Sequence, residues 1–173
     1  MACDLTRSRG KECKDVMGGN SVIYLYDELQ DPFTLVAESA TGMNVALTAA
    51  YSYELEGDGS TLEQVMVSDI NTGTRTCVQT ITFVLKKQTA ADLAEFNLLC
   101  ASGAQAVIKT RAGDFHALGI TEGMSWNVTS TTGAAKTDLQ GFTIVGTATE
   151  TQFAPLLDSA TQTAFLAVVV AVV

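Results

Sequence analysis

The segment GMSWNVTSTTGAAKTDLQGFTIVGTATETQFAPLL, residues 123–157, decides the fold class of this chain. It begins with a glycine and an apolar strand candidate, and a turn of small residues follows. A second strand candidate starts within DLQGFT (138–143), ends at Glu150 and is followed by Ala-Pro. Runs rich in Val, Thr and aromatic residues between glycine turns are typical of antiparallel strands. The segment therefore predicts a β-rich protein.

The rest of the chain contains further strand candidates separated by turn sequences. Residues 74–87 alternate threonine with Cys, Val, Ile and Phe at a period of two, as a half-buried antiparallel strand does. Asp31-Pro32, GDGS (57–60) and NTG (71–73) are turn sequences. The predicted strands are SVIYLY (21–26), FTLVAES (33–39), NVALTAAYSYELEG (44–57), LEQVMVSDI (62–70), TRTCVQTITFVLKK (74–87), AQAVIKT (104–110), GDFHALG (113–119), MSWNVTSTT (124–132) and DLQGFTIVGTATE (138–150).

One helix is predicted, over residues 90–102. Thr89 is a suitable N-cap, and Asp92 lies in the first turn, where the helix dipole favours a negative charge. Gly103 is expected to end the helix. Apolar residues recur at helical spacing and form one stripe, which we expect to pack on the core. The stripe consists of Leu93, Phe96, Leu99 and Cys100.

A chain of 173 residues is large enough to bury a sizeable core, and we predict a single domain over residues 1–173. The predicted fold is mainly β: an antiparallel β-sandwich or barrel with one flanking α-helix, an N-terminal arm (1–20) and an apolar C-terminal strand (162–173). The final run AFLAVVVAVV (164–173) falls short of the roughly 20 apolar residues that a membrane span needs. It is interpreted as a strand buried on both faces, covered by this subunit's own sheet or by a neighbour's.

Charged residues make up 17% of the chain and hydrophobic residues 47%, a balance that suits a β-rich protein buried in an assembly. The net charge is −9, but residues 15–74 contain no Lys or Arg, whereas Arg7, Arg9, Lys11 and Lys14 lie in the first fourteen residues. This basic arm either pairs with an acidic neighbouring subunit or is a frayed terminus beside a solvated acidic face. Tight nucleic-acid binding is disfavoured, because it needs clustered cations.

The sequence predicts no catalytic, cofactor-binding or metal-binding residue. The single histidine, His116, is the only candidate base, with Asp114 near it in the sequence, and no nucleophile elbow or phosphate loop occurs. A pair of catalytic carboxylates stays open, without a preferred pair. The four cysteines form no CxxC pair, and with no signal peptide in the sequence we expect a cytoplasmic, reduced chain in which Cys77 and Cys100 are packing residues.

The order of elements in the second half resembles that of tail tube proteins of tailed bacteriophages. The matching elements are the helix 90–102, the strand through His116 and Leu118, the glycine turn 119–123, the strand through Trp126 and the sequence DLQGFT (138–143). The openings ACDLT (2–6) and CKDVMGG (13–19) also resemble those of structural proteins of phages that infect Bacteroidetes.

The resemblance implies a structural protein that is not an enzyme and needs no cofactor. Six subunits would form a ring whose sheets line a channel, and stacked rings would form the tube that conducts the genome. The implied partners are other copies of the chain, tail or head–tail connector proteins, a tape measure protein and, if the tail is contractile, a sheath. The implied location is the virion tail, assembled in the host cytoplasm. DNA would pass without specific binding, because an acidic wall repels phosphate.

Two sets of residues are candidates for these roles. The candidate lumen acids are Glu54, Glu56, Asp58, Glu63 and Asp69. The candidate subunit-interface residues are Arg7, Arg9 and Lys11 in the arm, and Phe165, Leu166, Val168 and Val170 in the predicted C-terminal strand, which would pair with a neighbour by strand addition.

Two alternative functions remain. The first is another virion protein, a capsid decoration or head–tail joining protein, which the net charge and apolar C-terminus also fit. The second, which is more remote, is a monomeric enzyme or ligand-binding β-barrel. The low content of charged residues argues against a monomer.

Overall fold

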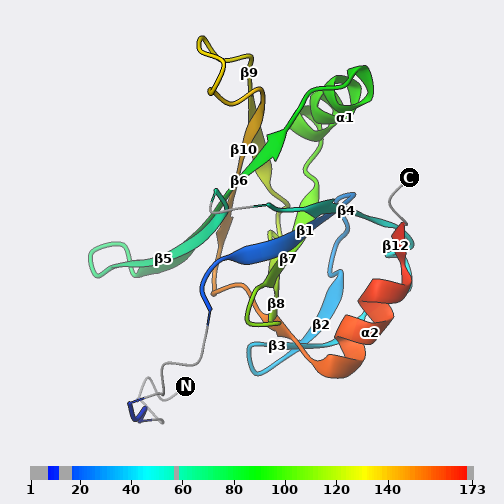
Figure 1. Cartoon of the computed structure of the whole chain (residues 1–173). Coiled ribbons are helices and arrows are strands. Elements are labelled where there is room, and N and C mark those ends of the chain that lie inside the picture. The colour runs from blue at the N-terminus through cyan, green and yellow to red at the C-terminus, as the bar shows by residue number, and fades with distance from the viewer. Residues whose placement is uncertain (1–7, 12–16, 57–58, 171–173) are drawn as a thin grey trace.

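The computed structural model describes residues 8–11, 17–56 and 59–170, which form two β-sheets and two helices (Figure 1). Sheet A has eight strands in the order β12-β4-β1-β7-β8-β11-β3-β2, and sheet B has four in the order β5-β6-β10-β9. The predicted mainly β fold is confirmed. The elements are β1 (Asn20–Tyr26), β2 (Phe33–Val36), β3 (Ser39–Met43), β4 (Ala50–Glu54), β5 (Thr61–Asp69), β6 (Thr74–Lys86), α1 (Ala90–Ala101), β7 (Gln105–Thr110), β8 (Phe115–Leu118), β9 (Ser125–Thr131), β10 (Gly141–Glu150), β11 (Leu156–Leu157), α2 (Ser159–Ala167) and β12 (Val169–Val170).

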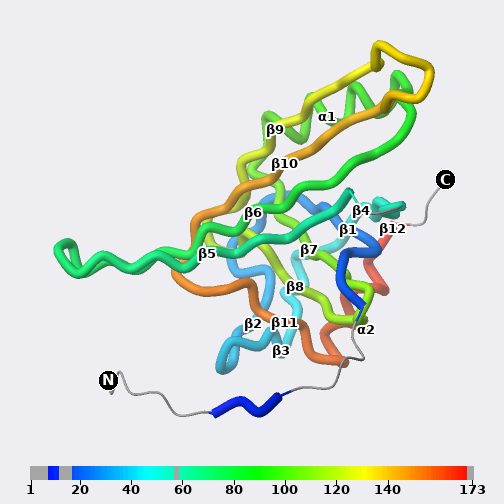
Figure 2. Tube along the Cα trace, turned by 60° about the vertical axis from the view of Figure 1, so that its left-hand side comes forward, coloured from blue at the N-terminus to red at the C-terminus, as the bar shows by residue number. Residues whose placement is uncertain are grey.

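Sheet A separates two hydrophobic cores. The first core lies between the sheets, where Ile23 and Ile108 of sheet A join Phe83 and Ile144 of sheet B in one cluster. The second core lies on the other face of sheet A, which curls around α2 (Figures 1 and 2). There the fully buried ring of Phe165 contacts the rings of Tyr24, Tyr26 and Phe33. The molecule is therefore layered as sheet B, sheet A and α2.

Helix α1 forms where the sequence predicts it. The hydroxyl of Thr89 accepts a hydrogen bond from the Asp92 backbone N–H (3.1 Å), and the Asp92 carboxylate accepts one from the Thr89 N–H (3.1 Å). This reciprocal capping box fixes the start of the helix. Ser102, rather than the predicted Gly103, is its C-cap. The buried ring of Phe96 contacts Phe142 of sheet B and Tyr53 of sheet A, so α1 lies where the two sheets meet.

The prediction of a C-terminal strand over residues 162–173 is wrong for most of its length. Residues up to Ala167 belong to α2, which Asp158 caps by accepting a hydrogen bond from the Thr161 N–H at 2.7 Å. Among the described residues of this segment, only Val169 and Val170 form a strand, which pairs in parallel with β4 of the same chain, and residues 171–173 lie outside the described part. The helix is favoured over a strand in this segment because its capped start places Phe165 in the second core. In the part of the chain that the structure describes, neither helix is long and apolar enough to cross a membrane.

Two other strand predictions differ from the structure in their extent. The predicted strand 33–39 is shorter in the structure, where β2 ends at Val36. Ala37 and Glu38 then turn the chain with positive φ angles of 49° and 68°. Of the described residues 44–56, only Ala50–Glu54 form a strand. A loop precedes it, in which the Asn44 carbonyl accepts a hydrogen bond from the Leu47 N–H at 3.0 Å. The predicted GDGS turn lies partly outside the described residues.

Gly146 allows the indole of Trp126 to pack on sheet B. The Trp126 ring is buried, and its Nε1 donates a hydrogen bond to the Ala104 carbonyl at 2.8 Å. A Cβ at position 146 would clash with this ring. We therefore expect Gly146→Ala to lower the free energy of unfolding by about 1–3 kcal/mol, the usual cost of overpacking a core.

The matched control is Gly42→Ala in β3, where a Cβ would make only ordinary contacts with Thr34 at 3.5 Å or more. This control should change stability by no more than about 1 kcal/mol. Urea unfolding followed by tryptophan fluorescence compares the two variants. Equal stability of both variants would contradict the packing argument.

Candidate assembly surface

The face of sheet B that points away from the core is lined mainly by threonine and valine. The register of the sheet aligns these side chains in rows across the strands, for example Ser125, Thr147, Thr80 and Glu63. Alternate residues on the same strands, such as Phe83 and Ile144, are buried in the first core. We call this surface the threonine face. It comprises Thr61, Glu63, Val65, Val67, Thr76, Val78, Thr80, Thr82, Val84, Ser125, Asn127, Thr129, Thr131, Thr143, Val145, Thr147 and Thr149.

The threonine face carries little charge. Glu63 is the one ionisable residue among those that define it. Asp69 and Lys86 lie beyond its two ends on the same side of the sheet, and the Lys86 ammonium forms an exposed ion pair with Glu56 at 3.0 Å. Hydroxyl and methyl groups therefore dominate this surface. It can form van der Waals contacts and weak hydrogen bonds, but it offers no cationic cluster to hold phosphate.

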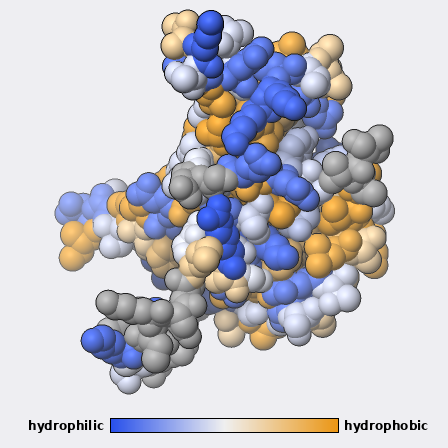
Figure 3. All heavy atoms as spheres, in the orientation of Figure 1, coloured by the Kyte–Doolittle hydropathy of each residue, from blue (hydrophilic) through white to orange (hydrophobic). Residues whose placement is uncertain are grey.

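Both edges of sheet B are open within the described chain. Strands β5 and β9 are its outermost strands and each has one sheet neighbour. The outer half of the β5–β6 hairpin projects from the body of the molecule (Figures 1 and 2). Val65 and Val67 on β5 are about half exposed, and Ile70 in the hairpin turn is 96% exposed. Figure 3 shows apolar atoms at the tip of this hairpin. Long apolar edge strands are sites at which another chain adds a strand.

The predicted lumen acids do not share one surface. Glu63 lies on the threonine face, and Asp69 lies at its end. Glu54 is in β4 of sheet A, and Glu56 follows that strand and pairs with Lys86. Asp58 lies outside the described residues. The structure therefore brings Glu63 and Asp69 together on one side of sheet B and leaves Glu54 on the other sheet.

The predicted interface residues also separate. Phe165 is fully buried in the second core, which corrects its assignment to a subunit interface. Val168 packs partly against the same core. The remaining candidates are Leu166 and Val170, each a little over 40% exposed, Arg9 and Lys11, which are exposed, and Arg7, which lies outside the described residues.

The threonine face was missed in the sequence analysis, although a signal for it exists. In β6 the buried residues are Cys77, Gln79, Ile81 and Phe83, so the alternation assigns the intervening threonines to the opposite face. Strand β10 has the same alternation. The sequence does not show that β9, β10, β6 and β5 lie side by side, because the central pairing, of β6 with β10, joins segments that are distant in the chain.

His116 lies on β8, and two adjoining cavities of about 540 and 460 Å³ share it and Gln64 as wall residues. Its Nδ1 atom is buried without a hydrogen-bond partner. Burial lowers the pKa of His116 below its ordinary value of 6.5, while the Ala154 backbone and the Asp114 carboxylate act in the opposite direction. Asp114 precedes β8 rather than lying on it, so the two residues are not an aligned pair on one strand.

The cysteines differ in their environments. Cys77 is fully buried in the core, as expected, but Cys100 is exposed, which corrects its interpretation as a packing residue. Cys3 and Cys13 lie outside the described residues. Among the residues that are described, no three His, Cys, Asp or Glu side chains gather in a way that could hold a metal ion.

Comparison of the chain with protein-family models, curated proteins and solved structures found no match.

The lowered pKa of His116 gives a pH dependence of stability. The unfolded histidine binds a proton near pH 6.5, whereas the folded one binds it only at lower pH, so the folded state loses stability as the pH falls below about 6.5. The pKa values of Asp138 and Asp158 are lowered by hydrogen bonds. These two residues therefore change the stability only at a pH below 3.8, the ordinary pKa of aspartate. We expect the urea midpoint of the dilute protein to fall between pH 7.5 and 5.5.

His116 is the only histidine in the chain, so His116→Gln should reduce this fall while leaving the stability at pH 7.5 less affected. Urea titrations at both pH values measure the effect. An equal fall in the variant and the wild-type chain would show that another group is responsible.

Proposed function

We propose that this protein is a structural subunit that assembles into rings, stacked as the tail tube of a tailed bacteriophage. The observation that carries the proposal is the pair of open edges, β5 and β9, on opposite sides of a sheet whose outer face has almost no charge. Joining β5 of one copy to β9 of the next continues sheet B from copy to copy. A closed ring of this kind leaves neither edge of sheet B exposed.

The size of the sheet is compatible with a channel for DNA. Six copies of a four-stranded sheet, at about 4.8 Å per strand, give a circumference of about 115 Å and a backbone diameter of about 37 Å. Side chains of roughly 5 Å on each wall leave a lumen of about 27 Å, which is wider than a DNA duplex.

The threonine face is the surface that would line this lumen. Its hydroxyl groups stay hydrated and give a phosphate backbone no cation to bind. Glu63 and Asp69 add negative charge from β5, so each would repeat once per subunit around the channel. The proposed wall is therefore a mainly neutral, hydroxyl-bearing surface with a small number of acids, and DNA slides along it without specific contacts.

The projecting β5–β6 hairpin supports contact between successive rings. Burial of Ile70, which is 96% exposed at the hairpin tip, against another surface would be favourable. In a stack of rings, the hairpin of one subunit would reach the adjacent ring and bury Ile70. Other tail or connector proteins at the two ends of the tube would bind the same surfaces that join one ring to the next.

The proposal is tested by negative-stain electron microscopy of the purified protein over a concentration series. We expect rings or hollow tubes with a channel that admits duplex DNA. A chain that stays monomeric at the highest concentration would contradict the proposal and favour a decoration protein that binds only to its capsid.

A substitution on β5 tests the role of this edge. Val65→Lys places a cation on the edge strand itself, and a charged side chain on an edge strand disfavours the addition of another strand. We expect it to raise the concentration needed for assembly at least tenfold, as measured by sedimentation velocity. Val45→Lys is the matched control, because Val45 is 92% exposed in a loop away from sheet B. Normal assembly of Val65→Lys would exclude the β5 edge from the ring contact.

A further inference from the structure

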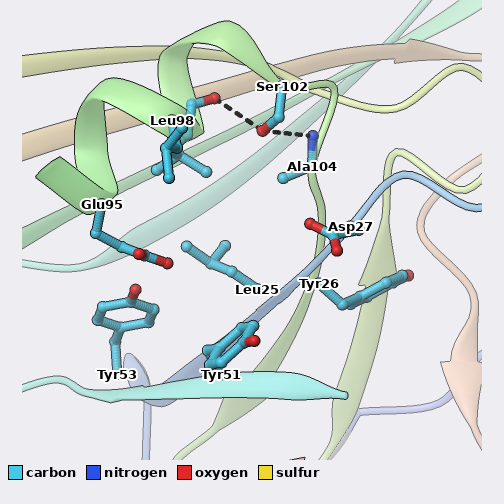
Figure 4. A pocket seen from close by; sticks show the side chains of 10 residues that line it. Leu25, Tyr26, Asp27, Tyr51, Tyr53, Glu95, Leu98, Ser102 and Ala104 are labelled. Carbon is cyan, nitrogen blue, oxygen red and sulfur yellow. Dashed lines mark hydrogen bonds between the residues drawn. The ribbon is translucent and has the colours of Figure 1, made fainter. Parts of the chain in front are cut away.

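A small cavity between α1 and sheet A combines carboxylates with aromatic walls. Its volume is about 260 Å³, and its wall includes Leu25, Asp27, Tyr51, Tyr53, Glu95 and Leu98. Figure 4 shows the Glu95 carboxylate beside the hydroxyl of Tyr53 and the Asp27 carboxylate on the opposite side of the space. No lysine or arginine is among the residues that line it. We call this cavity the tyrosine pocket.

The tyrosine pocket is suited to one cationic side chain. Its volume is below the roughly 300–1,000 Å³ that is usual for small-molecule sites. Aromatic rings attract a cation to their faces, and the carboxylates of Asp27 and Glu95, which are exposed at the pocket, can pair with ammonium or guanidinium. Burial, together with the charges of Glu95 and Asp92, raises the pKa of Tyr53 to about 12, so its hydroxyl stays neutral. The local field therefore favours a positive guest.

The exposed rim adds an apolar contact surface. Leu98 of α1 is 67% exposed and Tyr51 of β4 is 45% exposed, and both line the pocket. The methylene groups of a lysine or arginine pack on such surfaces while the charged head reaches the carboxylates. A peptide with cations spaced along it therefore suits the pocket better than a free metal ion.

We propose that the tyrosine pocket binds a lysine or arginine from residues 1–14, the basic part of the N-terminal arm, of a neighbouring copy of this chain. The inference rests on the proposed self-assembly. The arm holds Arg7, Arg9, Lys11 and Lys14, four of the ten cations of the chain. Figures 1 and 2 place residues 8–11 at the end of the molecule opposite α1, so these four residues lie away from the pocket of their own chain. A second copy supplies the cation instead.

A mixing experiment with charge-reversed chains tests this contact. The first variant, Glu95→Lys, reverses a charge in the pocket, and Glu95 is exposed on the surface of α1, so the chain should still fold. The second variant, Arg7→Glu with Lys11→Glu, reverses two charges in the arm. Each variant alone should need at least tenfold more protein to assemble in low salt, measured by sedimentation velocity.

An equimolar mixture of the two variants should recover assembly. Alternating copies would place a basic arm in each acidic pocket and an acidic arm in each basic pocket, which a contact within one chain would not achieve. Glu122→Lys, the same charge change at an exposed residue outside the pocket, is the control and should assemble like the wild-type chain. If Glu95→Lys assembles normally, or if the mixture is no better than its parts, the arm does not occupy the pocket.

A binding measurement separates failure of this contact from failure of the proposed function. The probe is a synthetic peptide of residues 1–14 with Cys3→Ser and Cys13→Ser, titrated into the full chain and followed by calorimetry. The wild-type chain should bind it at least tenfold more tightly than the Glu95→Lys chain. Selective binding by a chain that never forms rings would keep the pocket contact and overturn the tail tube proposal. Equal or no binding to both chains, while rings still form, would overturn the pocket contact alone.

Discussion

The two-sided burial of β1 and β7 is the constraint on which the rest of this structure depends. Ile23 and Ile108 point to the core between the sheets, while Tyr24 and Val107 point to the core around α2. A strand covered on both faces must be apolar throughout, and it can pair only in one register without moving side chains to the wrong core. Sheet B and α2 are therefore held on opposite sides of the same central strands.

Sheet B differs from these central strands, because only one of its faces is buried in a core. Its inner face completes the first core, and its outer face points away from both cores of the described chain. In a monomer that surface and the β5 edge stay in water, although Val65 and Val67 lie there. Threonine suits both contact with another subunit and exposure to water, because its methyl group packs against a neighbour and its hydroxyl group bonds to water. The composition of the face is thus consistent with a surface that is covered at its edges and hydrated at its centre.

How far the sequence predicts the structure depends on how local each signal is. Strands β6 and β10 and helix α1 follow from alternation and a capping box that involves only Thr89 and Asp92. The C-terminal prediction failed because β-branched residues at 168–170 outweighed the Asp158 cap and the burial of Phe165, which depends on a distant core. The threonine face and the tyrosine pocket need long-range pairings, since Asp27, Tyr51 and Glu95 come from three separate parts of the chain.

The charge distribution connects the two proposed contacts. Residues 1–14 carry four cations and two acids, a net charge of +2, so a total of −9 leaves −11 on residues 15–173. Bodies with this charge repel one another when their sheet edges approach, and pairing of edge strands alone must overcome that repulsion. An arm that enters a neighbour's acidic pocket brings positive charge to the place where the two bodies meet. The sheet edge then supplies the geometry of the contact, and the arm lowers the electrostatic cost of forming it.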